Sequence, residues 1–327
     1  MKLGYFLSSE EFGPRELVDQ AVKAKEAGFQ DLWISDHFHP WNDQQGHSPF
    51  VWSTIGAISQ AAPGMGVTTA VTCPTMRIHP AVIAQAAATA AMLLDGRFAL
   101  GVGTGEALNE HILGDRWPAA PERREMLEEA VDIIRQLWIG GVHSHHGKHY
   151  RVDHARIYDL PEQAPRILVS GFGPRSVDLA ARIGDGFVTV GPDAESVERF
   201  RSQARRGSYA GAGLKVCYDA DEQRARETVH RLWPNEALPG ELAQVLPTPS
   251  HFEQACQLVS VDAATEDVPC GPELERHIDA IRAYEEAGFD ELYIQQIGPD
   301  QAAFFEAYRE HVLPQFQAGR LAQAGGR

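Results

Sequence analysis

Cysteine is scarce in this chain. Only four of the 327 residues are cysteines, at positions Cys73, Cys217, Cys256 and Cys270, and no two of them form a C-x-x-C pair. Disulfide frameworks and zinc sites usually need closer pairs. We therefore expect four buried thiols in a reducing compartment, which predicts a cytoplasmic protein.

Basic residues and long apolar runs are also in short supply. The chain has 29 Lys and Arg against 45 Asp and Glu, a formal net charge of −16. Nucleic-acid binding needs the opposite sign, so we expect no nucleic-acid partner. No apolar run approaches the roughly 18 residues of a membrane span, and the first residues become polar too soon for a signal peptide. An anionic cofactor remains compatible, because helix N-termini give local positive potential.

Short β-branched runs alternate with longer helical stretches almost from end to end. The expected strands are 2–8, 31–36, 66–73, 97–103, 166–170, 186–190, 213–218 and 291–295. The expected helices are 14–28, 52–62, 80–94, 122–139, 176–183, 194–204, 221–232, 273–287 and 301–313. This alternation predicts a parallel (β/α)8 barrel. A doubly wound open sheet competes, but the chain has no dinucleotide fingerprint.

Two stretches interrupt the alternation. Residues 140–165 are polar and histidine-rich, with 150–152 and 157–160 as expected hairpin strands, and 234–271 contain several prolines without a clear period. We interpret both as insertions in one barrel domain that spans 1–317, followed by a tail at 318–327. Residues 26–34 and 286–294 are similar in sequence, and in both a predicted helix ends at a glycine and a predicted strand follows. This similarity supports a fold built from equivalent βα units.

Functional residues of a barrel gather where its strands end. His37 follows the second strand, and it is the expected general acid or base because an imidazole suits proton transfer near neutral pH. Asp36 or another carboxylate could orient it. Glu106, after a Gly-Thr-Gly turn, is a second proton-transfer candidate, and Trp41 offers an apolar wall or an N–H donor. In the alternative interpretation these residues are purely structural: Asp36 caps a loop, His37 is a hydrogen-bonded loop residue and Trp41 belongs to the core.

Two further patterns have weaker implications. The glycine turn at 171–176 opens a helix after the fifth strand, and a helix N-terminus with Arg175 and Ser176 could hold a phosphate. The run 143–149 contains four histidines. Metal sites need fixed geometry and supporting contacts, so we interpret this run as a solvated surface and expect no metal.

At the strand ends the sequence resembles the F420-dependent glucose-6-phosphate dehydrogenase branch of the luciferase-like superfamily. The matching stretches are SDHFHPW at 35–41, HSPF at 47–50, PAVIAQ at 80–85, GVGTGEALNE at 101–110 and GDGF at 184–187. The resemblance implies a (β/α)8 barrel, usually a homodimer, that holds the deazaflavin coenzyme F420 in its mouth. It also implies a non-proline cis peptide after the third strand, at Ala70–Val71.

The resemblance assigns roles to individual residues. His37 would act as acid or base on the substrate hydroxyl, Glu106 would transfer a proton near the deazaflavin ring, Trp41 and Glu10 would line the reaction site, and Asp36 would contact the cofactor. Together with the strand-end positions, it predicts a larger cofactor-binding set: Asp36, Ala70, Val71, Cys73, Gly103, Thr104, Asn109, Gly171, Phe172, Gly173, Arg175 and Ser176.

The sequence departs from the sugar-phosphate enzymes where they hold the phosphate. A lysine follows their sixth strand, but this chain has Asp193 there. It has no basic residue at 239–242 and no clear counterpart of a later arginine between His251 and Val261. A phosphate pocket without cations loses charge-assisted hydrogen bonds of roughly 1.5–3 kcal/mol each. We therefore predict an F420-dependent oxidoreductase for a non-phosphorylated alcohol or carbonyl, with an FMN-dependent monooxygenase and a non-catalytic F420-binding protein as alternatives.

Overall fold

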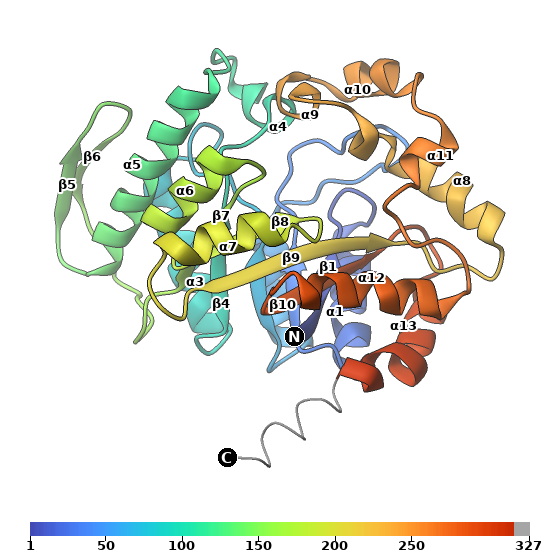
Figure 1. The fold of residues 1–327 in the computed structure, drawn as a ribbon. Helices are drawn as coiled ribbons and strands as arrows, with labels where there is room; N and C mark the ends of the chain where they lie inside the picture. The colour runs from blue at the N-terminus through green and yellow to red at the C-terminus, as the bar shows by residue number, and fades with distance from the viewer. Residues whose placement is uncertain (317–327) are drawn as a thin grey trace.

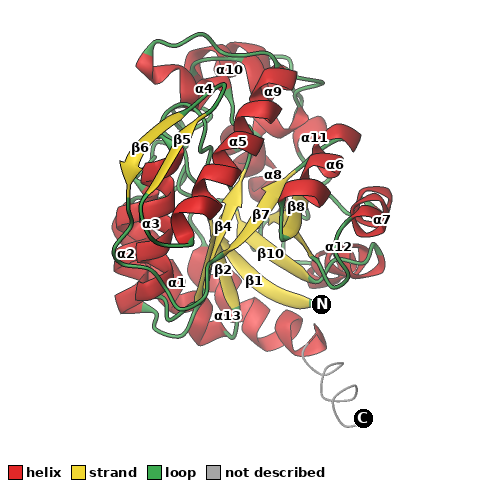
Figure 2. Ribbon diagram, turned by 90° about the vertical axis from the view of Figure 1, so that its left-hand side faces the viewer, coloured by secondary structure: helices red, strands yellow, loops and turns green. Residues whose placement is uncertain are grey.

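The computed structural model describes residues 1–316, and eight parallel strands in it close into a barrel (Figures 1 and 2). Around the barrel the strands follow the order β1-β10-β9-β8-β7-β4-β3-β2. Their bounds are β1 Lys2–Leu7, β2 Asp31–Ile34, β3 Gly66–Thr69, β4 Phe98–Val102, β7 Arg166–Ser170, β8 Gly186–Val190, β9 Tyr209–Val216 and β10 Glu291–Gln296. The predicted (β/α)8 barrel is confirmed.

Helices surround the barrel and connect its strands. They are α1 Pro14–Ala27, α2 Val51–Ala61, α3 Pro80–Leu93, α4 Ala107–Glu110, α5 Ala120–Trp138, α6 Pro174–Ile183, α7 Ala194–Gln203, α8 Glu222–Leu232, α12 Leu274–Glu286 and α13 Gln301–Ala307, with the short turns η1 His111–Leu113 and η3 Tyr308–Val312. Helix α1 begins with a proline and ends at Gly28, which has a φ of 101°. Gly288 takes a φ of 90° at the end of α12. Both glycines cap a helix in the left-handed region and lead into a strand, so the two similar segments are structurally equivalent.

Side chains of the strands alternate between two cores. On β10, Leu292 and Ile294 belong to the core between barrel and helices, whereas Tyr293 belongs to the core inside the barrel. Inside the barrel the rings of Trp33 and Tyr293 stack with centroids 4.3 Å apart. This alternation decides which side chains of each strand point towards the barrel axis and its mouth.

Two strand boundaries differ from prediction by four residues, and several others differ by one or two. Strand β9 begins at Tyr209 and not at 213, because the small residues that resemble a loop in the sequence make room for aromatic rings inside the barrel. A Cβ on Gly211 would lie 2.4 Å from Tyr209 Oη, and one on Gly213 would lie 3.5 Å from the Trp33 ring. Strand β3 ends at Thr69 and not at 73, just before the predicted cis peptide at Ala70–Val71, which is present.

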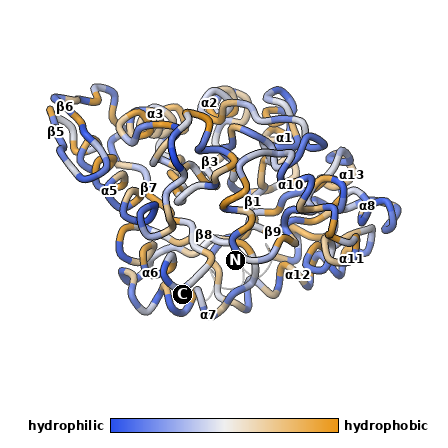
Figure 3. The backbone as a smooth tube through the Cα atoms, turned by 90° about the horizontal axis from the view of Figure 1, so that it is seen from above, coloured by the Kyte–Doolittle hydropathy of each residue, from blue (hydrophilic) through white to orange (hydrophobic). Residues whose placement is uncertain are grey.

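A hairpin is present, but only one of its two predicted strands is right: 150–152 overlaps β6, whereas 157–160 forms no strand. Strand β5 is the histidine run His143–His146, and it pairs with β6, Arg151–Ala155. The reason is a contact that the sequence does not show: Glu129 of α5 accepts hydrogen bonds from the backbone N–H groups of His149 and Tyr150, which fixes the turn. The hairpin projects to one side of the barrel (Figure 3).

The second insertion forms a cap over the carboxyl ends of the strands. It contains η2 Pro234–Ala237, α9 Leu242–Val245, α10 Pro249–Cys256 and α11 Val261–Ala264, where the sequence showed no clear period. Figure 1 shows α9 and α10 at the top of the molecule beside α4. The predicted tail at 318–327 lies outside the described residues. Within residues 1–316, no helix combines the length and the apolar character needed to cross a membrane.

Candidate active site

A histidine and a carboxylate meet at the mouth, above β1 and β2. His37 Nε2 lies 3.4 Å from Glu10 Oε1, and both side chains are largely buried. The Nδ1 of His37 is 3.2 Å from the carbonyl oxygen of His39, to which it can donate. Ser8 and Ser35 donate to the other Glu10 oxygen, at 2.9 and 2.7 Å. If the His39 carbonyl holds a proton on Nδ1, a second proton taken up at Nε2 gives a cation that Glu10, beside Nε2, stabilises.

Trp41 forms the wall beside this pair. Its ring packs against the edge of His37 with centroids 5.1 Å apart and against Phe252 of the cap, also at 5.1 Å. Trp41 also packs on a small buried cluster that includes Trp233. The cap insertion therefore encloses the space in front of His37, which limits the access of water.

Asp36 faces away from His37 and into a buried ion cluster. One of its oxygens accepts from Thr72 and the other from Arg77, both at 2.8 Å. Arg77 also lies 3.5 Å from the carboxylate of Glu110, which accepts its backbone N–H at 2.8 Å. The cluster connects the loops after β2 and β3 with α4. Glu10 is thus the carboxylate beside His37, whereas Asp36 fixes the loop that carries it.

Helix α4 positions two further predicted residues. Asn109 is buried, and its Oδ1 accepts from the backbone N–H groups of Phe38 and His39 at 2.9 and 3.1 Å. Its Nδ2 donates to Glu106 at 3.5 Å. Glu106 is only partly buried, at the start of α4. Asn109 therefore orients both the histidine loop and the second proton-transfer candidate.

The loops after β3 and β4 pack tightly on each other. A Cβ on Gly103 would lie 2.7 Å from Val71 Cγ2, and one on Gly105 would lie 2.6 Å from Cys73 Sγ. Gly105 also has a φ of 76°, which favours glycine. Burial, with the negative charge of Glu110, raises the pKa of the Cys73 thiol, so it stays protonated. Ala70 and Val71 pack against the interior core of the barrel, and Thr104 beside them is partly buried.

The predicted glycine turn lies at the start of α6. Gly173 is the N-cap and has no side chain to accept the first N–H groups of the helix. Among the described residues, no atom would come within 4 Å of a Cβ on Gly173. Phe172 and Arg175 are exposed, and Gly171 packs on Ser176. The turn adjoins the β4 loop, because a Cβ on Gly103 would lie 3.7 Å from Ser170.

Several residues of the mouth were not singled out from the sequence. Arg77 lies several residues past the end of β3, so a search limited to the residues directly after each strand does not find it. Glu11 is buried and accepts from Trp233 Nε1, Gln295 Nε2 and the Gly298 N–H. Burial raises its pKa to about 7 although these donors oppose the shift. Glu11 stood in the run after the first strand, but its partners come from the cap and β10, and no local signal connects them.

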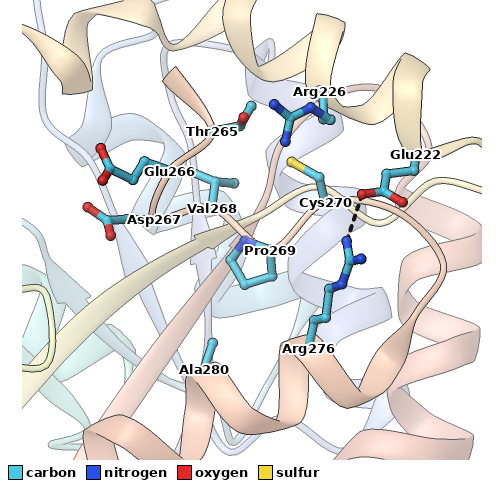
Figure 4. Close-up of a pocket in the computed structure, with 10 residues that line it drawn as sticks. All are labelled: Glu222, Arg226, Thr265, Glu266, Asp267, Val268, Pro269, Cys270, Arg276 and Ala280. Carbon is cyan, nitrogen blue, oxygen red and sulfur yellow. Dashed lines mark hydrogen bonds and ion pairs between the residues drawn. The ribbon is translucent and has the colours of Figure 1, made fainter. Parts of the chain in front are cut away.

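A separate hollow of about 310 Å³ lies outside the mouth, between α8, the 265–270 loop and α12 (Figure 4). The ion pair between Arg276 and Glu222, 2.7 Å long, spans it. This ion pair joins the first turn of α8 to the first turn of α12. Among residues 1–316, no three His, Cys, Asp or Glu side chains form a group that could hold a metal ion.

Comparison with known proteins relates this geometry to a family. The model of the luciferase-like monooxygenase family matches residues 1–291. An F420-dependent glucose-6-phosphate dehydrogenase of Microbacterium testaceum is 36% identical over 97% of this chain and 98% of its own. A protein with the same name from Nakamurella multipartita is 37% identical over 97% of each chain.

Solved structures agree in fold. An F420-dependent secondary alcohol dehydrogenase in complex with an F420–acetone adduct superposes with a TM-score of 0.89 at 29% identity, covering 96% of this chain and 98% of that one. A coenzyme F420-dependent tetrahydromethanopterin reductase from Methanopyrus kandleri, 19% identical with a TM-score of 0.77 over 96% and 99% of the two chains, shares the fold. The chain belongs to the luciferase-like family, in the branch that contains the F420-dependent glucose-6-phosphate dehydrogenases.

Proposed function

We propose that this F420-dependent oxidoreductase transfers a hydride between coenzyme F420 and a non-phosphorylated alcohol or carbonyl compound. The observation that carries the proposal is the buried pair of His37 and Glu10 at the mouth, 3.4 Å apart, beside the wall formed by Trp41. A histidine held between a carbonyl at Nδ1 and a carboxylate at Nε2 is suited to take up the proton of a hydroxyl group as its carbon loses a hydride, because the carboxylate stabilises the imidazolium that results.

The residues of the mouth fit a flat anionic cofactor. The start of α6 at Gly173 has no side-chain cap, and it offers the positive end of the helix and the exposed Arg175 to a phosphate. The loops with Ala70, Val71, Cys73, Gly103 and Thr104 would hold the ring system. When bound, F420 supplies the hydride acceptor or donor. His37 then exchanges the hydroxyl proton, and Glu106 holds a proton near the ring.

The names of the relatives suggest glucose 6-phosphate as the substrate. The residues after β8 argue against a phosphorylated substrate for this chain. At the position of their phosphate lysine, Asp193 caps α7: its oxygens accept from the Ser196 N–H at 3.0 Å and from the Ser196 hydroxyl. These hydrogen bonds lower the pKa of Asp193, which keeps it ionised. A fixed carboxylate repels a phosphate where the dehydrogenases would attract it.

Fluorescence titration of the purified protein with F420, and with FMN as the control, tests the cofactor. We expect selective F420 binding at micromolar affinity or tighter. Preference for FMN would favour the alternative, a monooxygenase. F420 binding without any turnover across alcohols and carbonyls would leave a binding protein, and turnover of glucose 6-phosphate would refute the proposed substrate class.

His37→Ala separates chemistry from cofactor binding. The His37 side chain contacts Glu10, Trp41 and the His39 carbonyl, none of which belongs to the predicted cofactor-binding set, so we expect F420 affinity to remain while kcat falls by about 10²–10⁴. Stopped-flow reduction of F420 by the alcohol measures this step. Loss of F420 affinity in the variant would contradict the role assigned to His37.

The remaining predictions concern location and assembly. The four buried thiols support the proposal that the protein works in the cytoplasm. We also propose a homodimer, supported by two adjacent surface helices without a charged residue, α2 and α3. A charge-free surface is unusual in a chain with 23% charged residues and is typical of a buried interface.

A further inference from the structure

The inner faces of β9 and β10 place two polar side chains at the mouth. Leu214 and Val216 of β9, like Ile294 of β10, pack in the core outside the barrel. Alternation therefore turns Lys215 and Gln295 inward, one layer above the interior core. The two are register partners on neighbouring strands. Their side chains consequently point side by side into the mouth.

Of the two polar atoms in the side-chain amide of Gln295, one has a hydrogen-bond partner and the other has none among the described residues. Its Nε2 donates to Glu11 Oε1 at 3.3 Å, which fixes the orientation of the amide. Its Oε1 accepts no hydrogen bond within residues 1–316, although the residue is only 1% exposed. A buried acceptor without a donor is unfavourable. The site therefore gains from a ligand that donates a hydrogen bond at this oxygen.

Lys215 supplies the complementary group. Its ammonium lies 4.5 Å from the centroid of the Trp233 ring and 3.2 Å from Glu236 Oε1, and its side chain is 15% exposed. An ammonium has three N–H donors, and this ion pair uses one. Lys215 can therefore donate to a ligand oxygen in the mouth without leaving Glu236.

Two chains of contacts connect these residues with His37. Gln295 contacts Glu11, and the preceding residue Glu10 lies 3.4 Å from His37. On the other side, Lys215 contacts Trp233, which shares a buried cluster with Trp41, whose ring packs on His37. All these groups belong to the same sector of the rim, formed by β1, β2, β9 and β10.

The charges of this sector select the kind of ligand. Glu10 and Glu236 outnumber Lys215 in this sector, and Glu11, whose pKa is raised to about 7, adds a partial negative charge, so a phosphate or carboxylate would meet net repulsion. A hydroxyl group both donates and accepts hydrogen bonds. It can therefore satisfy Gln295 Oε1 and Lys215 at once, which a ketone or ether oxygen cannot.

We propose that Gln295 and Lys215 bind a second hydroxyl group of the substrate, so that the substrate is an uncharged diol or polyol and not a simple alcohol. This inference rests on the proposed function, because it takes the group oxidised at His37 as the first hydroxyl. Gln295 and Lys215 are then specificity-determining residues, and Trp233 forms the wall against the carbon chain.

Binding of 1,2-propanediol and of 2-propanol, which differ by one hydroxyl group, tests the inference without turnover. Trp41 and Trp233 make intrinsic fluorescence a direct readout. We expect the wild-type protein to bind the diol at least tenfold more tightly than 2-propanol. Gln295→Met and Lys215→Met should reduce this preference at least fivefold. Gln223→Met, on the exposed face of α8, is the matched control and should retain it.

Equal binding of both alcohols by the wild-type protein would overturn the inference, and so would an undiminished preference in folded Gln295→Met. Circular dichroism checks that each variant folds. If Gln295→Met does not fold, the diol preference of Lys215→Met tests the inference in its place. The ratio of kcat/KM for the two alcohols with F420 should follow the same order. Oxidation of both alcohols without diol preference refutes the inference alone, whereas diol preference without F420 binding refutes the proposed function alone.

Discussion

Glu110 shows how burial changes the chemistry of a single residue near the mouth. Its side chain is buried beside Arg77 and close to Asp36. Burial raises its pKa to about 7; hydrogen bonding and the charge of Arg77 oppose the shift, and the charges of Glu106 and Asp36 add to it. The folded protein thus keeps a proton on Glu110 near neutral pH that the unfolded chain releases above about 4.5.

Glu110→Gln should make stability less sensitive to pH. Between pH 4.5 and 7 the folded wild-type protein binds more protons than the unfolded chain, so its stability falls as pH rises through this window. One pKa unit is worth about 1.4 kcal/mol, and we expect the variant to gain on the order of 2 kcal/mol relative to wild type between pH 5 and 8. Urea unfolding of both proteins at these pH values measures it. Parallel pH profiles would contradict the assignment.

At the scale of elements, β9 is determined by its neighbours more than by its own residues. Tyr209 donates to Glu291 at 3.0 Å inside the barrel, and its ring lies under Arg166. Tyr209 therefore cannot move easily when a neighbour grows. Two glycines of the same strand have different surroundings. A Cβ on Gly211 would lie too close to Tyr209 Oη, whereas a Cβ on Gly213 would lie at an ordinary contact distance from the Trp33 ring.

Gly211→Ala should destabilise the protein, whereas Gly213→Ala should not. The new Cβ at 211 would lie 2.4 Å from the fixed Tyr209 Oη, an overpacking that costs about 1–3 kcal/mol. At 213 the Cβ would lie 3.5 Å from Trp33, and replacing a strand glycine then gains about 0.5–1 kcal/mol. Thermal denaturation of both variants measures the difference. Equal melting temperatures would show that the interior relaxes freely.

At the scale of the whole molecule, charge is unevenly distributed. Helices α2 and α3, of 11 and 14 residues, contain no charged residue, and they contact each other at one edge of the molecule (Figure 3). Val82, Met92 and Leu93 of α3 are exposed. An exposed, uncharged pair of helices in a chain of net charge −16 provides a surface on which two copies can meet without repulsion.

Thr89→Lys, in the middle of the exposed face of α3, should weaken the proposed dimer. Two-fold symmetry would bury the new charge twice, without a partner on the uncharged face. Light scattering after size exclusion should show a dimer for wild type and a shift towards monomer for the variant. Gln203→Lys on α7 is the surface control. A wild-type monomer at micromolar concentration would refute the assembly.

The sequence by itself determined the barrel and the strand ends that carry the chemistry. Apolar periodicity is local, and the carboxyl ends of parallel strands must meet at one mouth, so His37 and Glu106 could be placed there from their positions alone. The family resemblance also located the cis peptide. The fold and the location of the mouth could therefore be predicted without knowledge of side-chain contacts.

Only the tertiary structure decided which groups at the mouth touch. It placed Glu10 beside His37 and turned Asp36 towards Arg77, 41 residues away. It also aligned Gln295 with Lys215, 80 residues apart in the chain, and extended β9 through its glycines. These pairings depend on the register between strands and on packing inside the barrel, which are set by contacts distant in sequence and leave no local periodic signal.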